Sequence, residues 1–135
     1  MKLLGIDIGG SGVKGALVDT EKGDLVTDRL RIDTPQPAQP TAVIGVIKEI
    51  VQHFDYHGPL GVGFPGVVMH GVTMTAANVD SGWINYPAGR QIALATNCET
   101  TIRNDADVAG IAEMYHGAGK GETGVVMIFT LGTGI

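Results

Sequence analysis

A carboxylate and a glycine-rich turn near the start of the chain have the composition of a phosphate site. Asp7 lies at the end of a short apolar run, the segment Gly9-Gly10-Ser11-Gly12 follows it, and Lys14 comes two residues later. Consecutive glycines let neighbouring backbone N–H groups point into one concavity, a nest that binds phosphate oxygens. Ser11 adds a hydroxyl donor and Lys14 a charge, and Asp7 is placed to hold Mg²⁺ through water. A plain β-hairpin whose glycines serve only the turn is the alternative.

A second candidate lies where an expected strand runs into an expected helix, at Asn104 and Asp105. The helix dipole stabilises a carboxylate at a helix N-terminus as the anion, so Asp105 can orient a substrate hydroxyl and accept its proton. Asn104 offers both a donor and an acceptor to sugar hydroxyls. Asn and Asp are also ordinary helix caps, so capping without catalysis is the alternative. Asp107, in the first turn of the same helix, suits the helix dipole rather than catalysis.

Further glycine turns and one aromatic residue complete the set of candidates. Gly132-Thr133-Gly134 follows an apolar run at residues 125–131, and a nucleotide or polyphosphate bound between two such turns would explain why the chain has both. A glycine-rich chain end without a ligand is the alternative. Gly63-Phe64-Pro65-Gly66 and residues 76–83 are weaker signals of irregular backbone between strands. Trp83 either packs on the face of a sugar or belongs to the core.

Hydrophobic periodicity predicts the elements that must position these residues. The runs at 3–8, 13–19 and 24–32 are separated by turn-sized gaps and predict an antiparallel meander. A proline-rich connector at 34–40 precedes an apolar stripe typical of a helix over 43–54. The remaining expectations are a strand at 60–64, a hairpin at 67–75 turning at His70-Gly71, a helix at 88–95, a strand at 100–103, a helix at 105–116 ended by Gly117, and a strand at 125–131. This order predicts an α/β fold with a mixed, five-stranded type of sheet and flanking helices.

Composition limits the classes of function. The 135 residues suit one domain, and the net charge of −5 comes without a basic stripe, because the basic residues are scattered apart from Arg29 and Arg31. Nucleic acid is therefore not an expected partner. The single cysteine, Cys98, excludes a disulfide or a thiolate zinc cluster within the chain and is expected to be a small buried side chain. No apolar run approaches the roughly 20 residues that span a bilayer, so we expect no membrane partner and a cytoplasmic location.

Taken in order along the chain, these motifs resemble the ROK sugar kinases, and more narrowly the polyphosphate/ATP glucokinases among them. The general resemblance rests on residues 7–14, Gly63-x-Pro65-Gly66, Ala77-Asn78-Val79-Asp80 with Trp83, Asn104-Asp105-Ala106 and Leu131-Gly132-Thr133-Gly134-Ile135. The narrower one rests on Gly9-Gly10-Ser11-Gly12, Asp33-Thr34-Pro35-Gln36-Pro37-Ala38, Gly58-Pro59-Leu60-Gly61-Val62 and residues 75–80. The resemblance covers essentially the whole chain.

The resemblance implies an actin-like ATPase (ribonuclease H-like) fold and phosphoryl transfer from ATP or inorganic polyphosphate to the 6-hydroxyl of glucose. Asp105 would be the general base, and the sugar would be bound by Asn104, Asn78, Asp80 and the backbone near Gly66. Residues 7–14 would hold the transferred phosphoryl group, with Asp7 on Mg²⁺, and Gly132, Thr133 and Gly134 would hold the other phosphates. Relatives are usually dimers, so a homodimer is expected.

Family members continue past Leu-Gly-Thr-Gly-Ile with another glycine and a second domain. We therefore expect residues 1–135 to be the N-terminal domain of a two-domain kinase, inactive without its C-terminal domain. One alternative is a sugar-sensing ROK-type transcriptional regulator, although such proteins carry a helix-turn-helix before the first strand. The other is an actin-like ATPase without a sugar site, which would have little use for Asn104 and Asp105 beside the Asn78 loop.

Overall fold

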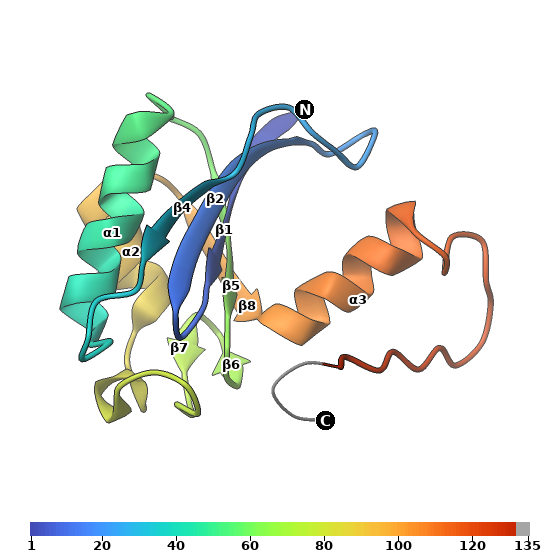
Figure 1. Ribbon diagram of the computed structural model, residues 1–135. Coiled ribbons are helices and arrows are strands. Elements are labelled where there is room, and N and C mark those ends of the chain that lie inside the picture. Colours follow the sequence, from blue (N-terminus) through green and yellow to red (C-terminus); the bar gives the residue numbers. More distant parts are fainter. Residues whose placement is uncertain (132–135) are drawn as a thin grey trace.

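The centre of the molecule is a mixed sheet, and the computed structural model describes residues 1–131 (Figure 1). Its strand order is β3 (Asp24–Leu25), β2 (Gly12–Asp19), β1 (Lys2–Ile8), β5 (Leu60–Phe64) and β8 (Thr100–Asn104), with β4 (Leu30–Asp33) also paired to β2. β2 is antiparallel to β1, β3 and β4, whereas β5 is parallel to both β1 and β8. The predicted meander followed by parallel strands is confirmed.

Alternation along β1 separates the core from the site. Leu4, Ile6 and Ile8 are buried, and Asp7 between them is exposed on the opposite face. Asp7 pairs with Lys14 of β2 and with Gly63 of β5, so these three positions form one row across the sheet. The strand pattern therefore gives the sheet one packed face and one face that carries charged residues.

Two helices cover the packed face. α1 (Pro40–His53) buries the stripe that its spacing predicted, including Val43, Ile47 and Ile50, and α2 (Ala88–Thr96) packs beside it through Ile92. Figure 1 shows both helices on the same side of the sheet. Cys98 lies in this core, as expected. No helix within residues 1–131 has the length and apolarity to cross a membrane.

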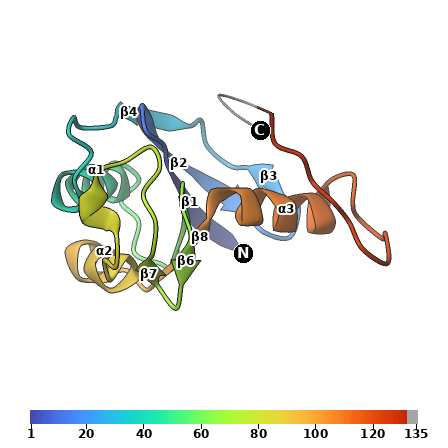
Figure 2. The same cartoon turned by 90° about the horizontal axis from the view of Figure 1, so that it is seen from below.

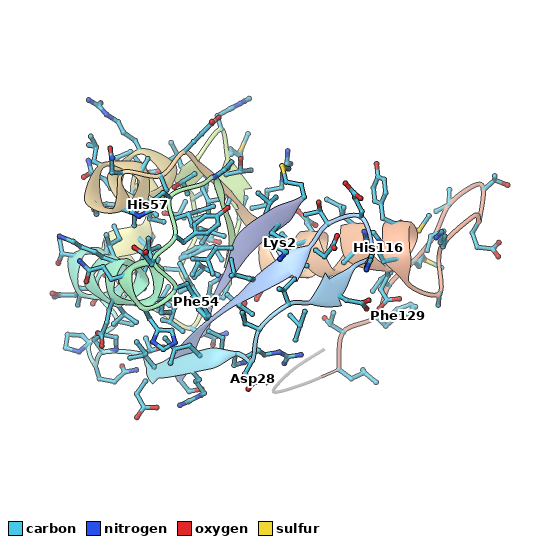
Figure 3. All side chains as sticks on the ribbon, turned by 90° about the horizontal axis from the view of Figure 1, so that it is seen from above. Lys2, Asp28, Phe54, His57, His116 and Phe129 are labelled. Carbon is cyan, nitrogen blue, oxygen red and sulfur yellow. The ribbon has the colours of Figure 1, made fainter. Side chains whose placement is uncertain are left out.

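α3 (Asp105–His116) lies on the other side and packs far less. None of its residues is buried, and it ends at Gly117, as predicted. Of the two caps that the sequence allowed, Asn104 and Asp105, the structure has Asn104. Figure 3 shows the separation of the two sides: Phe54 and His57 lie with α1, whereas His116 and Phe129 lie with α3. The face of the sheet that carries Asp7 is therefore covered only in part.

A small hairpin and a short turn of helix lie between β5 and α2. β6 (Val68–Met69) and β7 (Val72–Thr73) form the predicted hairpin, whose turn residues His70 and Gly71 both have positive φ. The irregular segment that follows contains a 3₁₀ helix, η1 (Ser81–Trp83).

Two expectations about strands were wrong. The strand predicted at 24–32 is broken into β3 and β4, because the hydroxyl of Thr27 accepts from the N–H of Leu17 where a ladder carbonyl would stand. The sheet therefore has six strands rather than five. The run at 125–131 forms no strand but lies extended beside α3 (Figure 2), with Ile128 close to Gly110. A strand needs a neighbour to pair its backbone, and within residues 1–131 this run has none.

Candidate active site

The candidate residues gather at one edge of the sheet because of its topology. β1, β5 and β8 are parallel, so their carboxyl ends share an edge, and ligands of open α/β sheets bind beyond that edge. Asp7 lies in register with Gly63, and Gly63 with Arg103, two residues before Asp105. Residues about a hundred positions apart in the sequence therefore meet at this edge.

Asp7 and Asp105 face each other across Gly63. A β-carbon on Gly63 would lie 3.6 Å from Oδ1 of Asp7 and 3.7 Å from the Cα of Asp105. Both aspartates line a cavity of about 730 Å³, together with Lys14. Glycine at position 63 leaves the space between Asp7 and Asp105 free of a side chain. The carboxylate that begins α3 and the residues flanking the glycine turn thus border the same space.

The charges in this cavity influence one another. Partial burial raises the pKa of Asp7, the Lys14 ammonium 3.8 Å away lowers it, and the negative charge of Asp105 raises it, with a net increase. Residues 1–131 contain no cluster of three or more His, Cys, Asp or Glu able to hold a metal by itself. Mg²⁺ is commonly held by one or two carboxylates, waters and substrate phosphates, and Asp7 beside Asp105 fits that requirement.

The glycine turn touches the loop that carries Asn78. Gly9 closes the turn by donating its N–H to the carbonyl of Gly12 at 3.0 Å. A β-carbon on Gly10 would lie only 2.7 Å from the carbonyl oxygen of Asn78, so the two segments are in close contact. The structure therefore places the predicted phosphate turn and one predicted sugar residue side by side.

Asn104 caps α3 and also binds the loop at Gly66. Its side-chain oxygen accepts from the N–H of Asp107 and caps α3, while its amide nitrogen donates to the carbonyl of Gly66 at 2.9 Å. Asp80 also has an internal partner, since its Oδ1 accepts from the N–H of Gly82 and caps η1. These hydrogen bonds fix the geometry of both side chains.

Trp83 belongs to the core rather than to a sugar platform. It is fully buried, packs against Phe64 and Tyr86, and donates its indole N–H to the carbonyl of Ala38 at 2.8 Å. Gly132, Thr133 and Gly134, the predicted second phosphate turn, lie outside the described residues.

The sequence analysis did not identify the residues whose side chains donate hydrogen bonds to the glycine turn. Thr34 and Gln36, interpreted as part of a rigid connector, both donate hydrogen bonds to the turn, and so does Arg31 of β4. These contacts span 20 to 26 residues of sequence, so no local pattern could reveal them.

Comparison with known proteins shows to which family the chain belongs. The ROK family model matches residues 3–135. The chain belongs to the ROK family. Its relatives include the polyphosphate glucokinase of Mycobacterium tuberculosis, which is 54% identical over 132 residues, covering 97% of this chain and 50% of the relative. The chain therefore spans about half the length of that relative.

Solved ROK-type structures share the fold. The inorganic polyphosphate/ATP-glucomannokinase of Arthrobacter sp. strain KM superposes with a TM-score of 0.88 at 42% identity, covering 91% of this chain and 51% of that one. A ROK family glucokinase from Streptomyces griseus, in complex with glucose and AMPPNP, gives 0.78 at 26% identity, covering 90% and 38%. The predicted actin-like ATPase fold is confirmed.

Proposed function

We propose that this chain is the N-terminal half of a glucokinase that transfers a phosphoryl group from inorganic polyphosphate or ATP to the 6-hydroxyl of glucose. The observation that carries the proposal is the placement of Asp7 and Asp105 on either side of Gly63, where both line one cavity between the sheet and α3. Relatives named as polyphosphate glucokinase and polyphosphate/ATP-glucomannokinase support the substrates.

Asp105 acts as the general base. Its exposed carboxylate, at the start of α3, can accept the proton of the sugar 6-hydroxyl. The sugar oxygen then bonds to the phosphorus as the bond from phosphorus to the donor oxygen breaks. Phosphoryl transfer has a loose transition state, so correct placement of the hydroxyl contributes more than the strength of the base.

The glycine turn and Lys14 bind the transferred group. The N–H groups of Gly10 and Ser11 and the Lys14 ammonium supply positive potential for phosphate oxygens. Asp7 would hold Mg²⁺, which neutralises charge on the donor phosphates. Gly132, Thr133 and Gly134 are proposed to bind the remaining phosphates.

Asn78, Asp80, Asn104 and the backbone at Gly66 form the proposed sugar surface. Asn104 already uses both its side-chain oxygen and its amide nitrogen internally, and Asp80 uses one carboxylate oxygen. The second amide N–H of Asn104 and the other oxygen of Asp80 keep hydrogen-bonding capacity for sugar hydroxyls. Asn78 lies against the glycine turn, which brings this surface next to the proposed donor phosphates.

The wider properties of the protein follow from the same proposal. A C-terminal domain of the family would close the cavity from the other side, and the protein would work as a cytoplasmic homodimer without nucleic-acid or membrane partners. The net charge of −5 fits the last point. The regulator alternative has less support, since relatives that match the chain in sequence carry glucokinase names.

The test is a comparison of phosphoryl donors on the full-length protein that contains this chain, with Asp105→Asn and the matched control Asp107→Asn. The asparagine at 105 keeps the shape but removes the proton acceptor, so we expect turnover to fall about 10²–10⁴-fold with little change in glucose KM. Asp107 lies in the same first turn, and its variant should retain nearly normal turnover. Near-normal turnover of Asp105→Asn would refute the role of Asp105, and a wild-type protein that phosphorylates no glucose would refute the proposed function.

A further inference from the structure

The connector between β4 and α1 holds the glycine turn by its carbonyl groups. The hydroxyl of Thr34 donates to the carbonyl of Gly9 at 2.6 Å, and the side-chain amide of Gln36 donates to the carbonyl of Gly10 at 3.0 Å. Both contacts join the turn to residues about 25 positions later in the chain. The connector is therefore bound directly to the proposed phosphate site.

The other carbonyls of the turn are occupied too. The carbonyl of Ser11 accepts from the backbone N–H of Thr34 at 3.2 Å and from the guanidinium of Arg31 at 3.0 Å. The carbonyl of Gly12 accepts from the N–H of Gly9. Every carbonyl oxygen from Gly9 to Gly12 thus has a donor.

Fixing a carbonyl also fixes the next N–H group. In a trans peptide the C=O of one residue and the N–H of the next lie in one plane and point in opposite directions. The hydroxyl of Thr34 therefore orients the N–H of Gly10, and the amide of Gln36 orients the N–H of Ser11. Within residues 1–131, these two N–H groups donate to no protein atom.

We propose that Thr34 and Gln36 are positioning residues for the phosphoryl donor, which turn the N–H groups of Gly10 and Ser11 toward an oligophosphate. They also keep the negative ends of the carbonyl dipoles away from the phosphate oxygens. This inference rests on the proposed function, because it assumes that the turn binds the donor. It adds that the connector determines the affinity for phosphate without touching it.

The chain offers variants that separate this role from general stability. Thr34 is only 5% exposed, so Thr34→Val removes the hydroxyl while keeping the shape, and Thr34→Ser keeps the hydroxyl. Gln36 is exposed, so Gln36→Met removes the donor at similar length without disturbing a core. Gln39, three residues later, is also exposed and its side chain makes no capping bond, which makes Gln39→Met the matched control.

The experiment uses the full-length protein and inorganic tripolyphosphate as the probe. Dissociation constants are measured by calorimetry, alongside the KM values for donor and for glucose and the thermal unfolding of each variant. We expect Thr34→Val and Gln36→Met each to weaken tripolyphosphate binding and raise donor KM about tenfold, with glucose KM changed less than about twofold. Thr34→Ser and Gln39→Met should behave like the wild type.

Three results would overturn the inference. The first is unchanged tripolyphosphate affinity in both Thr34→Val and Gln36→Met. The second is an equal loss of donor and glucose affinity together with a lower unfolding temperature, since that pattern indicates a structural role alone. The third is a wild-type protein that binds no tripolyphosphate.

Failure of the proposed function is a separate outcome. A wild-type protein that binds tripolyphosphate but phosphorylates no glucose refutes the glucokinase proposal, and the binding data still decide the role of the connector. If Thr34→Val does not fold, the exposed position 36 decides the question.

Discussion

The first two turns of the meander reverse the chain in different ways. The turn at 20–23, between β2 and β3, is closed by its own carboxylate: Asp19 accepts from the N–H groups of Glu21 and Lys22 at 3.0 and 3.3 Å, and Gly23 donates to the carbonyl of Asp19. The turn at 9–12, between β1 and β2, is instead held through its carbonyls by side chains from residues 31–36. The turn at 20–23 uses its N–H groups internally, whereas in the turn at 9–12 the N–H groups of Gly10 and Ser11 donate to no atom of residues 1–131.

The preceding carboxylates reflect this difference. The N–H groups of Glu21 and Lys22 lower the pKa of Asp19, whereas partial burial raises the pKa of Asp7. Both turns contain glycine, so glycine content alone does not identify a phosphate site. The two turns differ in whether their backbone N–H groups are available to bind an anion.

Among the variants that test the difference between the two turns, Gly10→Ala should have the largest effect on donor kinetics and stability. The added β-carbon would lie 2.7 Å from the carbonyl oxygen of Asn78, and backbone on both sides resists displacement. We expect the turn and the Asn78 loop to move apart, with a fall of about 10²-fold in kcat/KM for the donor and a loss of about 1–3 kcal/mol in the free energy of unfolding. Steady-state kinetics and denaturant unfolding measure both.

Gly23→Ala is the matched control in the other turn. Gly23 has a φ of +77°, which an alanine adopts at a cost of about 1–2 kcal/mol. The added β-carbon would also lie 2.5 Å from Cγ of His116, so that side chain, at the opposite end of α3 from Asp105, must shift. The variant should lose stability but retain its kinetics with the donor. If both glycine variants impair the donor equally, the distinction between the two turns fails.

Asp7→Asn should raise stability at neutral pH in the absence of metal. The fold raises the pKa of Asp7, so its ionised form destabilises the folded chain above the folded-state pKa. Below the ordinary aspartate value of about 3.9, both states are protonated and this cost disappears. Thermal unfolding at pH 7 and about pH 3 should therefore show a gain that vanishes in acid, and a variant less stable than the wild type at pH 7 would contradict this explanation.

Asp19→Asn should show the opposite sign and the smallest effect. The pKa of Asp19 is lowered, so its ionised form stabilises the fold above about pH 3.9, and that contribution is lost as the pH falls through the lowered pKa. The variant should be slightly less stable than the wild type at pH 7 and equal to it in strong acid. The asparagine oxygen can still accept from Glu21 and Lys22, which keeps the difference small. A gain in stability at pH 7 would argue against the turn's use of its own carboxylate.

Much of the fold follows from local signals. The stripe of α1 and the stop at Gly117 each depend on residues within a turn or two, and both were predicted, whereas the sequence left the N-cap of α3 open between Asn104 and Asp105. The meeting of Asp7 and Asp105 follows from one further step, since parallel strands align their carboxyl ends.

The features that could not be predicted depend on contacts between residues far apart in the sequence. Thr34 and Gln36 resemble spacer residues between prolines, and only the folded chain brings them to Gly9 and Gly10. The break between β3 and β4 arises because one hydroxyl, that of Thr27, replaces a ladder carbonyl. The run at 125–131 has strand propensity, but propensity does not supply a pairing partner.

That run also affects how the chain behaves at high concentration. Val125, Met127 and Phe129 are 95%, 76% and 75% exposed, and the run is uncharged, without proline, and rich in β-branched and other apolar residues. Such segments stack readily into intermolecular sheets. The net charge of −5 opposes this attraction between copies. The colloidal stability of the chain is therefore set by how completely residues 125–131 are shielded from other molecules.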